Sequence, residues 1–143
     1  MDSLGVPIEA IPNSLLGEIA EALQHYVVPI YTISPGIGSP RIWWFGSGTL
    51  VEVAGQHSIL TAAHVWDAIR DAEQIGLVLT TFLSGFTIRR ETISGRVIRN
   101  GDNPEWGPDL ALLTIPSACV GRISAHKSFL NLAQQRARFA ELR

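Results

Sequence analysis

The sequence predicts a mostly β protein, an antiparallel sandwich or a small closed barrel, with one helix near each end of the chain. Several short segments rich in β-branched and aromatic residues follow one another, separated by turns that contain Gly or Pro. No long helical pattern lies between them, which argues against a parallel α/β sheet. Apolar residues at helical spacing occur near the two ends of the chain.

The first predicted element is an amphipathic helix. Residues 12–14, Pro-Asn-Ser, precede a run with apolar residues three and four apart, which ends near Tyr26. A β-branched strand follows over residues 27–33, and Pro29 predicts that it lies at an edge, since proline has no N–H for the ladder. The apolar positions of the helix are Leu15, Leu16, Ile19, Ala22 and Leu23.

Six further strands are predicted along the chain. A Pro- and Gly-rich loop over residues 34–40 leads into the first of them, and the turn at 54–56, Ala-Gly-Gln, predicts a hairpin. A polar loop over residues 100–108 precedes the last strand. The six strands are expected at residues 42–53, 58–62, 75–83, 86–92, 93–98 and 110–115.

After Pro116 the apolar pattern becomes helical again, over residues 129–142. We therefore divide the chain into an N-terminal helical segment (1–27), a β-barrel (28–116) and a C-terminal helical linker (117–143).

Composition argues against several classes of protein. With 143 residues, 46% apolar and 17% charged, the chain suits one domain with a real core. A net charge of -2 argues against nucleic acid as a partner. Cys119 is the only cysteine, so no intrachain disulfide can form, and a reducing cytoplasmic location fits best. Residues 1–9 lack a basic start and no long apolar run follows, so we expect no membrane partner.

Two sequence motifs point to nucleophilic catalysis. Residues 59–65 read Ile-Leu-Thr-Ala-Ala-His-Val, and residues 107–113 read Gly-Pro-Asp-Leu-Ala-Leu-Leu. A serine hydroxyl needs an imidazole to take its proton, and a carboxylate behind that ring to fix its tautomer. His64 follows two small residues that allow a sharp turn, whereas Asp109 opens an apolar strand and is costly there unless it is paired. We expect the two side chains to meet.

Each residue also has an ordinary structural interpretation. His64 fits a helix N-terminus, or a half-buried position where the backbone satisfies its ring. Asp109 alone fits a solvated turn after Gly107 and Pro108. The occurrence of both motifs in this order favours the catalytic interpretation.

Together with Gly-Ser-Gly-Thr-Leu-Val at residues 46–51, the motifs resemble the trypsin-like (chymotrypsin-fold) serine peptidases over roughly residues 42–115. The resemblance implies a single antiparallel β-barrel of the chymotrypsin type, with His64 as general base and Asp109 as its acid. It also implies a peptide or protein substrate and no cofactor. In similar bacterial peptidases, a helical linker leads from this first barrel into a second one.

The nucleophile that the resemblance implies has no match in the sequence. Ser117, Ser124 and Ser128 lack the flanking glycines of the family's Gly-x-Ser-Gly segment. Ser47 lies between two glycines but precedes His64, and no helix pattern follows it. We therefore expect the isolated chain to be inactive, and a partner chain or a missing C-terminal half to complete it.

The remaining candidate residues are expected to be structural. Residues 43–45, Trp-Trp-Phe, and Trp66 are expected to pack into and over the barrel, and Cys119 to be a small buried hydrophobe. Three other histidines have no carboxylate or cysteine at metal-ligand spacing, so we expect no metal site. They are His25, His57 and His126.

Two functions remain open. The chain is a fragment or truncated form of a trypsin-like serine endopeptidase, or it is a non-catalytic pseudopeptidase that serves as an interaction module. The helix over residues 129–142 discriminates between them. A helix packed on the barrel favours the module, whereas an exposed apolar helix favours a missing second half.

Overall fold

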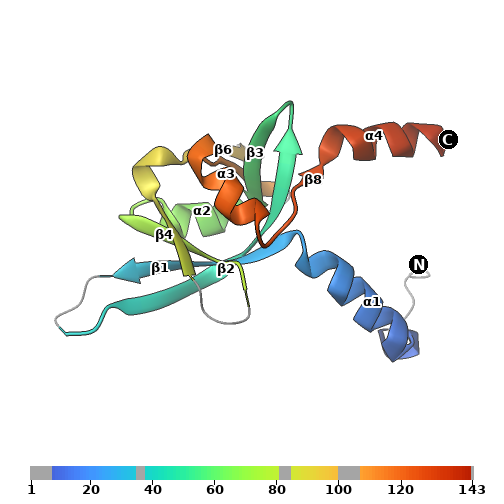
Figure 1. The fold of residues 1–143 in the computed structure, drawn as a ribbon, viewed down its shortest axis with the longest axis horizontal. Coiled ribbons are helices and arrows are strands. Elements are labelled where there is room, and N and C mark those ends of the chain that lie inside the picture. The colour runs from blue at the N-terminus through green and yellow to red at the C-terminus, as the bar shows by residue number, and fades with distance from the viewer. Residues whose placement is uncertain (1–7, 35–37, 81–84, 100–106, 143) are drawn as a thin grey trace.

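The protein is mostly β, as a computed structural model shows (Figure 1). The structure describes residues 8–34, 38–80, 85–99 and 107–142. Within these residues, eight strands form one curled, half-barrel sheet that is accompanied by four α-helices. The strands lie in the order β5-β4-β1-β2-β3-β7-β6, and β8 pairs with β2. All neighbours are antiparallel except the short β2–β8 pair.

The predicted strands overlap β1 through β7, and the predicted terminal helices overlap α1 and α4. Residues 90–92, predicted as strand, form a 3-10 turn, and residues 130–131, predicted as helix, form a short strand. The helices are α1 (Asn13–Gln24), α2 (Ala63–Ile69), α3 (Ser117–Ser124) and α4 (Leu132–Glu141), with short 3-10 turns η1 (Ile8–Ala10) and η2 (Arg90–Thr92). The strands are β1 (Val27–Ser34), β2 (Arg41–Val53), β3 (Gln56–Thr61), β4 (Gln74–Val78), β5 (Gly85–Arg89), β6 (Ser94–Arg99), β7 (Asp109–Thr114) and β8 (Leu130–Asn131). Residues 81–83 of one predicted strand, and 100–106 of a predicted loop, lie outside the described residues.

The prediction that Pro29 marks an edge strand is wrong, because β1 lies between β2 and β4. The pairing with β4 covers only Ile30–Thr32, which partner residues 75–77. Pro29 lies one residue before that ladder, where the absence of an N–H interrupts no described β4 pairing. The proline therefore lies just outside the β1–β4 ladder, and it does not force the whole strand to the edge of the sheet.

The hydrophobic core lies inside the curl of the sheet and is closed by α2. Val65, Trp66 and Ile69 of this helix pack against buried residues of the sheet. Trp66 is 5% exposed, as predicted, and packs closely against β6 because Gly95 has no side chain there. A Cβ added to Gly95 would lie 2.5 Å from the indole.

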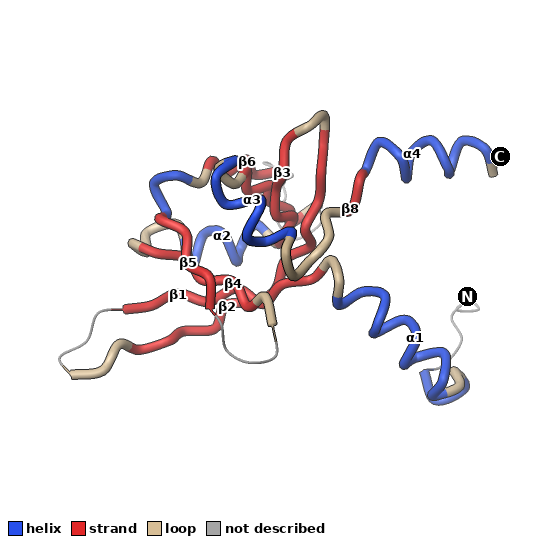
Figure 2. The backbone as a smooth tube through the Cα atoms, in the orientation of Figure 1, coloured by secondary structure: helices blue, strands red, loops and turns tan. Residues whose placement is uncertain are grey.

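The predicted packing of residues 43–45 is confirmed only in part. Phe45 is half-buried against the core, but Trp43 and Trp44 are both more than half exposed. They lie in the part of the β1–β2 hairpin that extends away from the core in Figure 2, where β2 has no neighbour except β1. Cys119, expected to be buried, is half-buried at the edge of the core.

The helices α1 and α4 project from the same side of the sheet (Figure 1). Neither contains a buried residue, and Phe139 of α4 is 67% exposed. The apolar stripe of α1, with Leu15, Ile19 and Leu23, is also exposed. Across the described ranges, no helix has the length and apolarity needed to cross a membrane.

Candidate functional site

The pairing of β3 with β7 brings the two predicted site residues together. Thr61, the last residue of β3, lies opposite Ala111 in this antiparallel ladder. Counting two residues further in each direction places Asp109 beside residue 63, where the chain turns from β3 into α2. His64 is the second residue of that helix. The sheet register therefore sets the neighbourhood of the two side chains, 45 residues apart in the sequence.

The alternation of side chains along β7 directs Asp109 toward His64. Asp109 shares a strand face with Ala111 and Leu113, both fully buried. Asp109 is the first residue of the strand and lies at the rim, where the apolar core ends. Its carboxylate can therefore face inward without entering the core. Ala63, which is fully buried, lets the chain turn tightly at this point.

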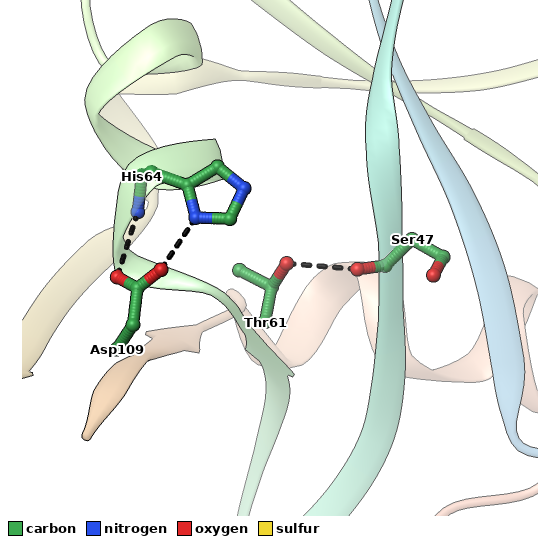
Figure 3. A network of polar contacts seen from close by, with 4 residues as sticks. All are labelled: Ser47, Thr61, His64 and Asp109. Carbon is green, nitrogen blue, oxygen red and sulfur yellow. Dashed lines mark hydrogen bonds and ion pairs between the residues drawn. The ribbon is translucent and has the colours of Figure 1, made fainter. Parts of the chain in front are cut away.

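Asp109 holds His64 at two atoms (Figure 3). Its Oδ1 accepts a hydrogen bond from the backbone N–H of His64 at 3.1 Å. Its Oδ2 lies 2.5 Å from Nδ1 of the imidazole. Two contacts from one carboxylate fix both the position of the backbone and the rotation of the ring. The structure thus brings together the two residues that the sequence predicts as base and acid.

This contact determines which nitrogen of His64 is available for chemistry. With Oδ2 as acceptor, Nδ1 carries the proton of the neutral ring, and Nε2 keeps a lone pair. In Figure 3 the second ring nitrogen points away from Asp109. It has no hydrogen-bond partner among the residues that the structure describes. The side chain of His64 is 75% exposed and that of Asp109 is 48% exposed, so a molecule outside this chain can reach Nε2.

Ser47 lies near this pair but presents its backbone to it. The backbone carbonyl of Ser47 accepts a hydrogen bond from Thr61 Oγ1 at 2.8 Å. Figure 3 shows its hydroxyl on the far side of that carbonyl from His64. The geometry agrees with the sequence-based rejection of Ser47 as nucleophile. Thr61, which sequence reasoning did not single out, ties β2 to the end of β3 just before the turn to His64.

The other histidines are not part of this site. His57 packs edge-on against Phe129 at 4.6 Å, with Nε2 3.9 Å from a carboxylate oxygen of Glu52. His25 and His126 line a separate hollow of about 520 Å³ beside Lys127, whose ammonium donates to the carbonyl of Gln24 at 2.5 Å. Partial burial lowers the pKa of Lys127. No group of three or more metal-binding side chains occurs in the parts of the chain that are described.

The three serines that follow β7 lie on other elements. Ser117 and Ser124 are the first and last residues of α3, and Ser128 lies just before β8, where its backbone N–H donates to the carbonyl of His25 at 2.7 Å. None of them bonds to His64 in the described structure. The described site thus consists of His64 and Asp109, without a described serine partner.

Comparison with models of protein families, with curated proteins and with solved structures finds no match to this chain. The function is therefore inferred from the geometry of the His64–Asp109 pair and from the surfaces around it.

Proposed function

We propose that this chain is the base- and acid-bearing half of a trypsin-like serine endopeptidase, which hydrolyses peptide bonds once a second barrel supplies the nucleophilic serine. The contact of 2.5 Å between Oδ2 of Asp109 and Nδ1 of His64 carries this proposal. It leaves Nε2 of the ring facing outward, as a general base requires.

In the proposed reaction, Nε2 of His64 takes the proton of a serine hydroxyl as the serine oxygen attacks the peptide carbonyl carbon. Asp109 stabilises the imidazolium that forms and remains ionised. His64 then gives the proton to the departing amine. In the second half of the reaction, His64 takes a proton from water, the water oxygen attacks the acyl carbon, and His64 returns the proton to the serine oxygen as the acid product leaves. Proton transfer by a positioned side chain contributes about 10²- to 10⁴-fold to the rate. The donors that stabilise the oxyanion belong, in this proposal, to the second barrel.

The strand order supports a barrel of the chymotrypsin type. Hydrogen-bonded neighbours run from β4 through β1, β2, β3 and β7 to β6. The chain itself continues the circuit, because η2 joins β6 to β5, and β5 pairs with β4. Counted as two arms of one bent strand, β5 and β6 give a cycle of six strands around the core. A closed circuit of antiparallel strands is what the resemblance to the peptidases implies.

The exposed surfaces of this chain support the proposal that a second barrel packs on it. Electrostatic catalysis works best where water is excluded, yet both His64 and Asp109 are open to solvent. Apolar residues at the end of α4 and just after it are exposed as well, with Phe139 and Leu142 at 67% and 82%. An exposed apolar closing helix favours the incomplete peptidase over a self-sufficient module. A barrel packed over His64 and Asp109 would shield the pair from solvent.

The alternative is a non-catalytic pseudopeptidase that acts as an interaction module. One observation favours it: the bond from the His64 N–H to Asp109 also caps α2, whose N-cap residue Ala62 has no side-chain acceptor. The acid thus has a structural use that does not depend on a nucleophile.

A fluorophosphonate probe, which reacts with activated serines, separates the two functions. The tagged chain is produced in its native host, purified with whatever it binds, and labelled. We expect no label on the chain itself and a label on the associated polypeptide. A His64→Ala variant that recovers the same polypeptide should lose this label, because the serine has lost its base.

The matched control is His126→Ala, which removes an exposed histidine from a different hollow and should leave labelling unchanged. Label on the isolated chain would show that the nucleophile is present after all. An unlabelled wild-type complex, or one whose labelling survives His64→Ala, would contradict the peptidase and leave the interaction module.

A further inference from the structure

A hollow of about 430 Å³ lies beside the catalytic pair's helix and belongs to no function described so far. Its walls come from β1, from Trp43 and Phe45 of β2, and from the segment that follows α2. Ala68, in the last turns of α2, forms part of its lining and comes one helical turn after His64. Residues four apart share a helix face, so Ala68 at the edge of the hollow lies about 6 Å along α2 from His64.

The lining of this hollow combines aromatic rings with negative charge. Asp71 and Glu73 supply two exposed carboxylates, and Trp43 supplies an indole that is 52% exposed. No Lys, Arg or His occurs among its lining residues. The hollow beside Lys127 has the opposite character, with two histidines and an ammonium group. The acidic hollow is therefore suited to a cation.

The two carboxylates and the indole of Trp43 have no ionic or ring partner among the described residues. Neither Asp71 nor Glu73 forms an ion pair among the residues that the structure describes. Trp44 contacts Tyr31 in a tilted arrangement with ring centroids 5.3 Å apart, whereas Trp43 has no ring partner in the described chain. Glu73 lines both the acidic hollow and a neighbouring hollow that contains Arg70. Asp71 lines only the acidic hollow.

We propose that this hollow binds the side chain of a Lys or Arg residue of a polypeptide. The aliphatic stem would lie along Trp43 and Phe45, and the charged head would meet the carboxylate of Asp71. A free cation such as a metal ion would not use the aromatic wall, whereas a basic side chain uses both. If the proposed function holds, this residue belongs to the substrate and lies one helical turn from His64, which makes the substrates basic near the cleaved bond.

The binding test uses two peptides that differ in charge alone. One is Ac-Ala-Ala-Arg-Ala-Ala-NH₂, and the other carries citrulline, the neutral isostere of arginine, in its centre. Binding is followed by the indole N–H signal of Trp43 in heteronuclear NMR spectra at low salt. We expect the arginine peptide to shift this signal saturably and the citrulline peptide to bind at least about fivefold more weakly.

Matched variants locate the site. Asp71→Asn and Trp43→Ala should each weaken the arginine peptide by about fivefold. Glu18→Gln, which makes the same charge change on α1, and Trp44→Ala, next to Trp43 in β2, should not weaken it. Dispersed amide spectra confirm that each variant is folded, and backbone amides near Ala72 report binding where the Trp43 signal is missing.

Equal binding of the two peptides, or affinities that Asp71→Asn leaves unchanged, would overturn the proposal. Equal weakening by Glu18→Gln would overturn it too, because net charge alone would then explain binding. His64→Ala should leave the affinity intact, so this test stands or fails apart from the assignment of His64 as base.

Discussion

At the scale of single residues, Gly76 shows how closely the sheet is packed. It lies opposite Tyr31 in the β1–β4 ladder, and a Cβ at this position would overlap the tyrosine ring. Tyr31 is only 6% exposed and also contacts Trp44, so its ring has little room to move. Burial raises the pKa of its hydroxyl. A side chain at residue 76 must therefore displace a fixed ring.

We expect Gly76→Ala to lower the free energy of unfolding by about 1–3 kcal/mol, the usual range for overpacking a core. Urea denaturation followed by circular dichroism measures it. Gly121→Ala is the matched control, because Gly121 lies within α3 and nothing lies within 4 Å of its added Cβ. This control should gain about 0.5–1 kcal/mol from better helix propensity. A Gly76→Ala protein as stable as the wild type would show that Tyr31 moves aside.

At the scale of elements, the unit formed by β3, α2 and β7 builds the site. Asp109 accepts from the second backbone N–H of α2, which no side chain at the N-cap satisfies. The same carboxylate therefore stabilises the helix and orients the ring. The bond to the backbone N–H remains when the histidine side chain is replaced. Substitution of His64 therefore separates the capping of α2 from the contact with the ring.

Asp109→Ala should lower the free energy of unfolding by at least about 1 kcal/mol, as expected for loss of a helix cap. His64→Ala should change it by less than about 0.5 kcal/mol, because the backbone N–H and the carboxylate both remain. Thermal and urea unfolding of the two variants provides the comparison. Equal losses in both would mean that the imidazole contact, and not the cap, stabilises the element.

The strands were predictable because their β-branched runs are bounded by clear turns, as at residues 54–55. The helices α2 and α3 were not predicted. Both are short, and their sequences contain no N-cap residue of the usual kind, since Ala62 and Pro116 stand there. Tertiary packing of Trp66 and Ile123 stabilises them instead, and local sequence does not report such packing.

The proximity of His64 and Asp109 could be predicted from the two motifs that contain them. The contact of Asp109 with the backbone N–H of His64 could not be predicted, because it depends on the register between β3 and β7. The acidic hollow was also missed, since its residues come from three separate segments. Trp43 lies where β2 continues beyond its pairing with β3, and the sequence pattern does not determine where that pairing ends.

At the scale of the whole molecule, a curled sheet holds two segments that are distant in the sequence in one geometry. The pair at its rim is exposed, and α1 and α4 carry unburied apolar residues on the side to which they project. These features agree with a protein whose chemistry needs a second body. The orientation of His64, in contrast, is complete within this chain and depends only on its folding.

The protonation of the His64 ring in the folded chain tests that orientation most directly. Two-bond ¹H–¹⁵N correlation spectra, recorded where imidazoles are neutral, show which nitrogen carries the proton. We predict the proton on Nδ1 of His64 in the wild type, and loss of this preference in Asp109→Ala and in urea. His25 and His126, both exposed, serve as internal controls that should not respond to Asp109→Ala. A proton on Nε2 of His64 in the folded wild type would contradict its assignment as an outward-facing base.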